Sequence, residues 1–153
     1  MVNEEDVEVF WTRGDIHSRV HLAMTKANLV NKKLEIEELF PIDQYHARGI
    51  AATVDLGKRM PIKKNQSILD IGCGLGGPAR YYAKEFGCFL TGIDITPSFV
   101  EIGNEFNKIT SMSNKVGLKV GNGEILDFKN ETFDGAYSQH VTMNISDREK
   151  FFS

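Results

Sequence analysis

The sequence LDIGCGLGGPARYYAKEFG, which runs from Leu69 to Gly87, joins a short hydrophobic run to a helix-like segment through a glycine-rich turn. Glycine loses more backbone freedom on folding than any other residue, so its density here indicates a local requirement. The turn must adopt unusual backbone angles or bring the backbone close to a ligand. Pro78 and Gly87 bracket the segment that follows, as is typical of the first turn and the end of a helix.

Strand-like and helix-like segments alternate after this point, which predicts an α/β fold with a parallel sheet and right-handed crossovers. We expect four strands: SILDIG (67–72), FLTGIDI (89–95), VGLKVGN (116–122) and FDGAYSQHV (133–141). Thr96 is placed to cap a helix between the second and third of them. Its buried stripe should be Phe99, Ile102, Phe106 and Ile109.

The first third of the chain has helical spacing. Asp15 is placed to cap a helix with the apolar stripe Ile16, Val20, Ala23, Ala27 and Val30. We expect a charged connector at 31–38, a break at Phe40-Pro41 and a second helix from Asp43 to Arg59. The predicted division is a helical cap with a lead-in helix at 1–62 and a cofactor-binding part at 63–153.

Composition limits the classes of partner. The 153 residues are 41% hydrophobic and 25% charged, which is ordinary for one globular domain. The net charge of −3 provides no field that attracts nucleic acid or an anionic membrane, so neither is an expected partner. Cys73 and Cys88 are too few for a disulfide framework, and they indicate a reducing, cytoplasmic location. The acidic N-terminus shows no signal-peptide pattern.

The glycines of the turn fit two ligand-binding patterns at once. Gly72, Gly74 and Gly77 spell the dinucleotide fingerprint G-x-G-x-x-G, whereas Gly72, Gly74 and Gly76 spell G-x-G-x-G. A tight structural turn without a ligand is the third interpretation. Ligands of open parallel sheets lie beyond the carboxyl ends of the strands, so we expect the N–H groups of the turn to face a nucleotide-like group.

Two acids narrow the choice of ligand. Asp70 lies two residues before the first glycine, where a carboxylate disfavours a pyrophosphate and suits an ammonium group. Asp94 ends the second predicted strand, where an acid accepts hydrogen bonds from a ribose diol. S-adenosylmethionine combines a ribose and an ammonium without any phosphate, so it matches both acids.

Four segments together resemble the successive motifs of class I S-adenosylmethionine-dependent methyltransferases. They are ILDIGCGLGGPARYYA, TGIDITPSFVEIG, VGNGEI and FDGAYSQHVTMNI. The chain is most similar to the small-molecule kind, such as ubiquinone/menaquinone-biosynthesis and sarcosine/dimethylglycine methyltransferases. The resemblance implies a Rossmann-like, doubly wound parallel sheet of seven strands, of which this chain supplies the first four. A capping-box pattern at Ser146–Glu149 close to the last residue fits the same expectation of a fragment.

The resemblance also implies the positions that hold the cofactor. Residues that line its methionine portion would be Asp70, Gly72, Cys73, Gly74, Gly76 and Gly77. Asp94 would bind the ribose, and Ile95 would pack on the adenine. Asn122 would contact the adenine amino group beside Gly123, although many relatives carry aspartate where Asn122 stands.

Four further positions would lie near the transferred methyl group or cover the cofactor. Gln139 and His140 follow the fourth strand, and His140 is the candidate general base. The segment DQYHARG resembles the one that covers the cofactor, which points to Tyr45 and His46. No metal site is expected, because His17 and His21 share a helix face but have no third ligand.

The expected function is therefore methyl transfer from S-adenosylmethionine to a small molecule, with S-adenosylhomocysteine as the product. Residues 138–141 read Ser-Gln-His-Val, so they lack the Asn-Pro-Pro-Tyr pattern of many nucleic-acid methyltransferases. A nicotinamide-dependent oxidoreductase and a non-catalytic cofactor-binding module remain as alternatives. We also expect that this chain alone is inactive and that it self-associates through the edge of its fourth strand.

Overall fold

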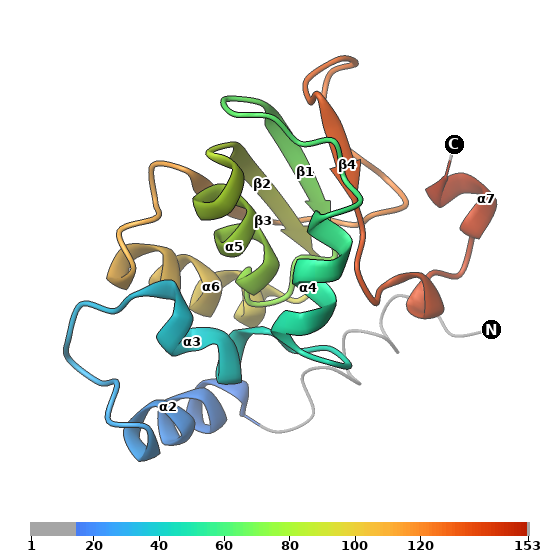
Figure 1. Ribbon diagram of the computed structural model, residues 1–153. Helices are drawn as coiled ribbons and strands as arrows, with labels where there is room; N and C mark the ends of the chain where they lie inside the picture. Colours follow the sequence, from blue (N-terminus) through green and yellow to red (C-terminus); the bar gives the residue numbers. More distant parts are fainter. Residues whose placement is uncertain (1–14, 153) are drawn as a thin grey trace.

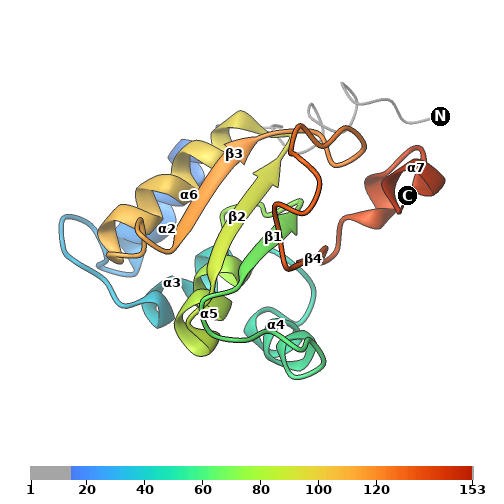
Figure 2. The same cartoon turned by 90° about the horizontal axis from the view of Figure 1, so that it is seen from above.

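The structure is a computed structural model that describes residues 15–152. Residues 1–14 and 153 lie outside this range, and with them the acidic N-terminal segment and the beginning of the predicted helical cap. Figures 1 and 2 show a parallel sheet with most of the helices gathered on one face and the C-terminal residues 142–152 set apart from them.

The sheet has four parallel strands in the order β3-β2-β1-β4, so the predicted Rossmann-like α/β fold is confirmed. Its strands are β1 (Ser67–Ile71), β2 (Phe89–Asp94), β3 (Val116–Val120) and β4 (Gly135–Tyr137). The chain winds outward from β1 to β3 and then returns to the other side of β1 (Figure 1). This reversal opens a crevice at the carboxyl ends of β1 and β4, where ligands of such sheets bind.

Strand β4 is shorter than the predicted span of 133–141. Asp134 lies just before it and accepts a hydrogen bond from the Ser67 N–H through its carboxylate, at 2.8 Å. After Tyr137 the chain leaves the sheet, and His140 takes a left-handed backbone conformation with φ 59°. The residues from 138 to 141 therefore bend over the carboxyl end of the sheet instead of extending it.

Helices α4 (Ile50–Gly57), α5 (Gly77–Phe86) and α6 (Pro97–Ile109) cover one face of the sheet (Figure 2). Strand residues such as Leu90 and Leu118 share a buried cluster with Tyr82 of α5. On the opposite face, three strand residues pack with aromatic side chains from outside the sheet: Leu69, Ile71, Ile93, Phe128, Phe133 and Phe151. The predicted bounds of α5 are confirmed, with Pro78 in its first turn and Gly87 as its left-handed C-cap.

Helix α2 (Ile16–Lys26) is shorter than its predicted apolar stripe. Ile16 and Val20 are buried as expected. Ala27 and Val30 lie beyond the helix, because the chain turns through residues with positive φ at Asn28 and Asn31. Asparagine tolerates this conformation better than most residues, and this tendency ends the helix early.

Helix α3 (Ile36–Asp43) begins within the predicted connector at 31–38 and continues through the predicted break at Phe40-Pro41. Its start is stabilised because the Glu38 carboxylate accepts a hydrogen bond from the Glu35 N–H at 3.0 Å. Pro41 is accommodated within the helix. The predicted helix from Asp43 to Arg59 is wrong for its first half, because positive φ angles at Arg48 and Gly49 delay α4 until Ile50.

A buried ion pair joins α3 to α5. The Arg80 guanidinium donates to the Asp43 carboxylate at 3.1 Å, and both side chains are almost completely buried. Arg80 also donates to the Leu75 carbonyl of the glycine turn, and to Gly103 and Asn107 of α6. One buried cation therefore connects helix α3, the glycine turn and α6.

The C-terminal segment contains a 3-10 helix, η1 (Thr142–Asn144), and the short helix α7 (Arg148–Phe151). The N-cap of α7 is Asp147, whose carboxylate accepts from the Lys150 N–H. The predicted capping role of Ser146 is therefore wrong by one residue, because Ser146 instead donates to Glu124. Within residues 15–152, no helix combines the length and the apolar character that crossing a bilayer requires.

Candidate functional site

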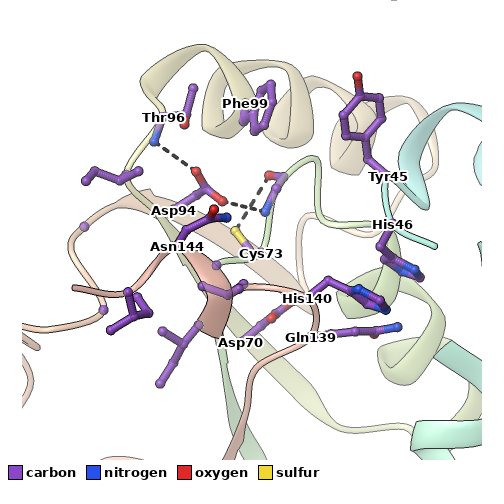
Figure 3. Close-up of a pocket in the computed structure, with 18 of the residues that line it drawn as sticks. Tyr45, His46, Asp70, Cys73, Asp94, Thr96, Phe99, Gln139, His140 and Asn144 are labelled. Atoms are coloured by element: carbon purple, nitrogen blue, oxygen red, sulfur yellow. Dashed lines mark hydrogen bonds between the residues drawn. The ribbon is translucent and has the colours of Figure 1, made fainter. Parts of the chain in front are cut away.

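A cavity of about 560 Å³ lies beyond the carboxyl ends of β1 and β2, under the segment that follows β4 (Figure 3). Eleven of the thirteen residues predicted for the site line it: Tyr45, Asp70, Gly72, Cys73, Gly74, Asp94, Ile95, Asn122, Gly123, Gln139 and His140. Gly76 and Gly77 do not line it. His46, expected in the covering segment, also lies on its wall.

The N–H groups of the glycine turn are satisfied inside the protein. The Ile93 carbonyl accepts from both Gly72 and Cys73, at 2.8 and 2.9 Å. The Asp94 carboxylate accepts from the Gly74 N–H at 2.8 Å. The prediction that these groups face the ligand is therefore wrong for these three residues, because they tie β1 to the end of β2.

Two glycines of the turn are required by close contacts, and a third leaves open space. A Cβ at Gly72, where φ is +79°, would meet Val141 Cγ2 at 2.2 Å. A Cβ at Gly77 would meet the Asp43 carbonyl oxygen of α3 at 2.4 Å, so this glycine serves helix packing. Gly74 differs, since a Cβ there would have no neighbour within 4 Å although φ is +53°. The space left by a missing side chain at Gly74 therefore belongs to the cavity.

Asp94 is held by two backbone groups at the end of β2. One carboxylate oxygen accepts from Gly74 and the other accepts from the Thr96 N–H at 2.9 Å. Burial raises the pKa of Asp94, and these hydrogen bonds oppose that effect. Thr96 occupies the N-cap of α6 as predicted, but its side chain makes no capping hydrogen bond, and its own N–H donates to Asp94. A carboxylate offers about four lone-pair positions, so Asp94 retains acceptor capacity toward the cavity.

Asp70 is a buried acid of the site with a strongly raised pKa. It is 2% exposed, and its carboxylate accepts a hydrogen bond from the Tyr137 hydroxyl at 2.7 Å. Burial raises the pKa of Asp70 to about 7; the Tyr137 hydrogen bond lowers it, and the negative charge of Asp94 raises it further. This carboxyl therefore titrates close to neutral pH, where a cationic ligand would favour its ionised form.

The thiol of Cys73 fills space beside these acids. It is 5% exposed, and burial raises its pKa well above the ordinary value, with Asp70 and Asp94 adding to the shift. A thiol in such surroundings stays protonated and is a poor nucleophile. The interpretation of Cys73 as a small packing residue therefore fits its environment.

The loop after β3 is joined to the C-terminal segment on another side of the cavity. The Glu124 carboxylate accepts hydrogen bonds from the N–H groups of Ser146 and Asp147, at 3.0 and 3.1 Å. Asn122 accepts from the Glu124 N–H at 2.8 Å through its side-chain oxygen. One oxygen that the sequence assigned to the adenine is therefore already engaged with the backbone.

A polar cluster lies where α4 meets the segment after β4. The Thr53 hydroxyl donates to the Gln44 side chain at 2.6 Å and lies 3.2 Å from the His46 ring nitrogen Nε2. Gln139 donates to the same hydroxyl at 3.5 Å. The rings of His46 and His140 stack, and Figure 3 shows these two side chains next to each other.

Tyr45 lies at the rim of the cavity and is 49% exposed. Its ring packs edge-on against Phe99 of α6, with centroids 6.3 Å apart. Its hydroxyl accepts a hydrogen bond from Arg19 of α2 at 3.2 Å. In Figure 3 this hydroxyl points away from Asp70 and Asp94, so in this structure the ring and not the hydroxyl faces the cavity.

Sequence reasoning missed several lining residues. Asp43, Pro78, Thr96, Phe99, Gly121, Val141, Asn144, Ile145 and Ser146 all contribute to the wall. Phe99 and Thr96 had been assigned to helix packing and capping, and those roles do not exclude a place on the wall. Residues 141–145 end the methyltransferase-like segment FDGAYSQHVTMNI and Ser146 begins the capping-box pattern, but neither pattern indicates a place on the wall. The bend after β4 brings these residues to the site.

The fold and the site together define a class of protein. A parallel sheet with a glycine turn after its first strand and an acid at the end of its second is the Rossmann-like, nucleoside-binding arrangement. The chain belongs to the methyltransferase family, since residues 69–153 match the family described as "Methyltransferase domain".

Known relatives and structures agree with this assignment. Norajmaline N-methyltransferase of Rauvolfia serpentina is 35% identical over 91 residues, which are 60% of this chain and 31% of that protein. The probable chloroplastic tocopherol O-methyltransferase of Oryza sativa subsp. japonica is 34% identical over 91 residues, 60% of this chain and 25% of that protein. The chain therefore spans less than a third of the length of these curated relatives.

A solved structure shows the same arrangement. Haemonchus contortus Phospholethanolamine N-methyltransferase 2, in complex with phosphomonomethylethanolamine and S-adenosylhomocysteine, superposes with a TM-score of 0.63 at 30% identity. The match covers 68% of this chain and 24% of that one.

Proposed function

We propose that this chain binds S-adenosylmethionine in the cavity and that the protein transfers its methyl group to a small-molecule acceptor. One observation carries the choice of ligand. The residues that line the cavity all lie within the part of the chain that the structure describes, and they include four carboxylates but no lysine or arginine. The four are Asp43, Asp70, Asp94 and Glu124, of which Asp43 is already paired with the buried Arg80. A ligand with a sulfonium and an ammonium group finds complementary charge there, whereas a phosphate does not.

The residues present fit an adenosine. Asp94 retains acceptor capacity at the end of β2 and would bind the ribose hydroxyls. Ile95 offers an apolar side chain for the adenine, with Asn122 and Gly123 beside it on the wall. The Asn122 oxygen accepts from the Glu124 N–H, and Asn122 would contact the adenine amino group through its side-chain amide.

The glycine turn would hold the methionine portion. Asp70 would accept from the ammonium group, while Gly72, Cys73 and Gly74 form the wall next to it. Gln139 lines the same cavity from the other side. Gly76 and Gly77 support the shape of the turn through packing and would make no contact with the cofactor.

When bound, S-adenosylmethionine supplies an activated methyl group on a sulfonium. The task of the protein is then to orient the acceptor and to exclude water, and orientation alone can lower a barrier by several kcal/mol. His140 projects onto the cavity wall and would remove a proton from an amine or hydroxyl acceptor. Tyr45 would close the rim through its ring, which packs on Phe99.

The relatives support a small-molecule acceptor, because their names include an N-methyltransferase of norajmaline and an O-methyltransferase of tocopherol. The rival interpretation as a nicotinamide-dependent oxidoreductase is disfavoured. Its pyrophosphate needs free N–H groups in the turn, and those of Gly72, Cys73 and Gly74 are engaged. A non-catalytic binding module remains the alternative that an activity assay decides.

Calorimetry on the 153-residue chain tests the cofactor assignment. S-adenosylhomocysteine should bind, and NAD at the same concentration should not. Binding of NAD alone would contradict the proposal. Methyl transfer is then tested with isotopically labelled S-adenosylmethionine and a panel of small amines, phenols and phosphobases. A protein that binds cofactor and methylates no member in its full-length form would instead be a binding module.

We further propose a cytoplasmic location, supported by two buried free thiols, Cys73 and Cys88. No role with nucleic acid or membrane is proposed, since the net charge is −3. Among the described strands β4 is an edge strand, which supports self-association through it. Sedimentation over a range of concentrations tests this, and a strictly monomeric chain would contradict it.

A further inference from the structure

Asp70 and Tyr137 are register partners across neighbouring parallel strands. Asp70 is the fourth residue of β1, and Tyr137 is the last residue of β4, directly opposite. Paired residues of adjacent strands project to the same face of a sheet. The Tyr137 hydroxyl reaches the Asp70 carboxylate at 2.7 Å, so the bond is built into the pairing of the two strands.

The Tyr137 ring is fixed by the packing behind it. Tyr137 is 8% exposed and does not line the cavity, whereas Asp70 does. Its ring lies edge-on to Tyr82 of α5, with centroids 5.1 Å apart and an interplanar angle of 86°. Tyr82 is itself held because its hydroxyl donates to the Thr53 carbonyl at 2.8 Å. The Tyr137 hydroxyl thus donates to Asp70, and the packing of its ring leaves it little freedom to move away.

We propose that Tyr137 is a positioning residue: it holds the Asp70 carboxylate in its ionised form and oriented toward the cavity, ready for a ligand's ammonium group. This inference rests on the proposed function, in which that ammonium belongs to S-adenosylmethionine. Tyr137 acts through Asp70 and touches no ligand. Its hydrogen bond favours the charged carboxylate where burial opposes it.

Burial and Asp94 disfavour the negative charge of Asp70, and Tyr137 is the neighbouring side chain that favours it. Asp94 on β2 contributes a like charge, and burial removes water. Cys73 and Tyr82 are kept protonated partly by Asp70 itself, so they add no positive charge. Arg80 is paired with Asp43 instead. The Tyr137 hydroxyl is therefore the local contact that stabilises the ionised form before a ligand arrives.

The test measures S-adenosylhomocysteine affinity from about pH 5.5 to about pH 8.5, a range that spans the Asp70 titration. In the unaltered chain, affinity should fall as pH drops through about 7, because protonated Asp70 cannot attract an ammonium. Tyr137→Phe should displace this fall upward by about one pH unit and leave affinity at the alkaline end nearly unchanged.

Tyr82→Phe is the matched control. It removes a buried tyrosine hydroxyl from the same cluster without touching the Asp70 bond, so it should lower stability without displacing the pH profile. In an Asp70→Asn background, Tyr137→Phe should have little further effect on affinity. An equal loss of affinity at every pH in Tyr137→Phe, or the same displacement in Tyr82→Phe, would overturn the inference.

A measurement without ligand separates this inference from the proposed function. Carbon-detected NMR of the Asp70 carboxyl should show its titration at higher pH in Tyr137→Phe than in the unaltered chain. If that shift occurs and S-adenosylhomocysteine does not bind, the proposed function fails while the link between the two side chains holds. If the Asp70 titration is the same in both proteins, the positioning role is wrong.

Discussion

The rings of His46 and His140 lie face to face, with centroids 5.3 Å apart and an interplanar angle of 3°. One belongs to the segment between α3 and α4, and the other to the segment that leaves β4. Burial lowers the pKa of His46, and His140 adds a smaller effect in the same direction. His140 is exposed and faces the cavity, so the outer ring of the stack is the one available for proton transfer.

His140→Ala should reduce turnover far more than it reduces cofactor affinity. A positioned general base typically contributes ~10²–10⁴-fold to rate, whereas the cofactor contacts lie elsewhere in the cavity. The measurement pairs a methyl-transfer assay on the full-length protein with calorimetry using S-adenosylhomocysteine. His21→Ala is the control, because His21 is an exposed histidine of α2. Similar turnover in both variants would exclude His140 as the base.

Asp94→Ala should weaken binding of S-adenosylhomocysteine by about 1–3 kcal/mol, because two ribose hydroxyls and two backbone N–H groups lose their acceptor. Asp94→Asn retains one acceptor oxygen and should lose less. Calorimetry compares both with Asp127→Ala, which removes an exposed acid from the loop after β3. An Asp94→Ala protein that is folded and binds with unchanged affinity would refute the ribose assignment.

Gly72 and Gly74 should respond differently to replacement by alanine. Gly72→Ala places a Cβ against Val141 and should destabilise the fold by about 1–3 kcal/mol through overpacking, in addition to backbone strain. Gly74→Ala meets no neighbour and should cost only the ~1–2 kcal/mol of a left-handed non-glycine residue. The added methyl group enters the cavity, so Gly74→Ala should lose ligand affinity. Denaturant unfolding and calorimetry measure the two effects, and the reverse ranking in stability would contradict the packing described here.

Asp70 should make the free energy of unfolding depend on pH. Its folded pKa of about 7 lies above the ordinary value of ~3.9, so between these values the folded state binds more protons than the unfolded state. Stability should therefore decrease as pH rises through this window and level off above about 7. Each unit of pKa difference corresponds to ~1.4 kcal/mol.

Asp70→Asn removes that dependence while keeping an oxygen for the Tyr137 hydroxyl. Its unfolding free energy should vary less between about pH 5 and about pH 8 than that of the unaltered chain. Urea titrations at both pH values test this. A variant whose pH dependence equals that of the unaltered chain would show that Asp70 does not titrate there.

Local patterns were enough to predict the sheet. The alternation of strands and helices, the bounds of α5 and the buried stripe of α6 all depend on neighbours in sequence, and the structure confirms them. Asp70 and Asp94 follow the same logic, since each lies at the carboxyl end of a parallel strand. Their place on the cavity wall needed no knowledge of long-range packing.

Other features depended on contacts between distant segments. The sequence gives no sign that Gly77 would face the backbone of Asp43, so a packing glycine was assigned to the ligand. The bond of Asp70 to Tyr137 arises from strand pairing across 67 positions, which no local spacing reveals. The course of α3 was mispredicted because proline normally ends a helix, and here the helix accommodates it.

The pairing of Asp43 with Arg80 constrains how the sequence can change. Replacing either residue alone would leave a bare charge in the protein interior, at a cost of about 3–5 kcal/mol, a large part of the stability of an ordinary domain. Replacing both together with apolar side chains of similar volume can be nearly neutral. In divergent copies of this protein, the two positions should therefore change as a unit, with few surviving intermediates that carry only one of them.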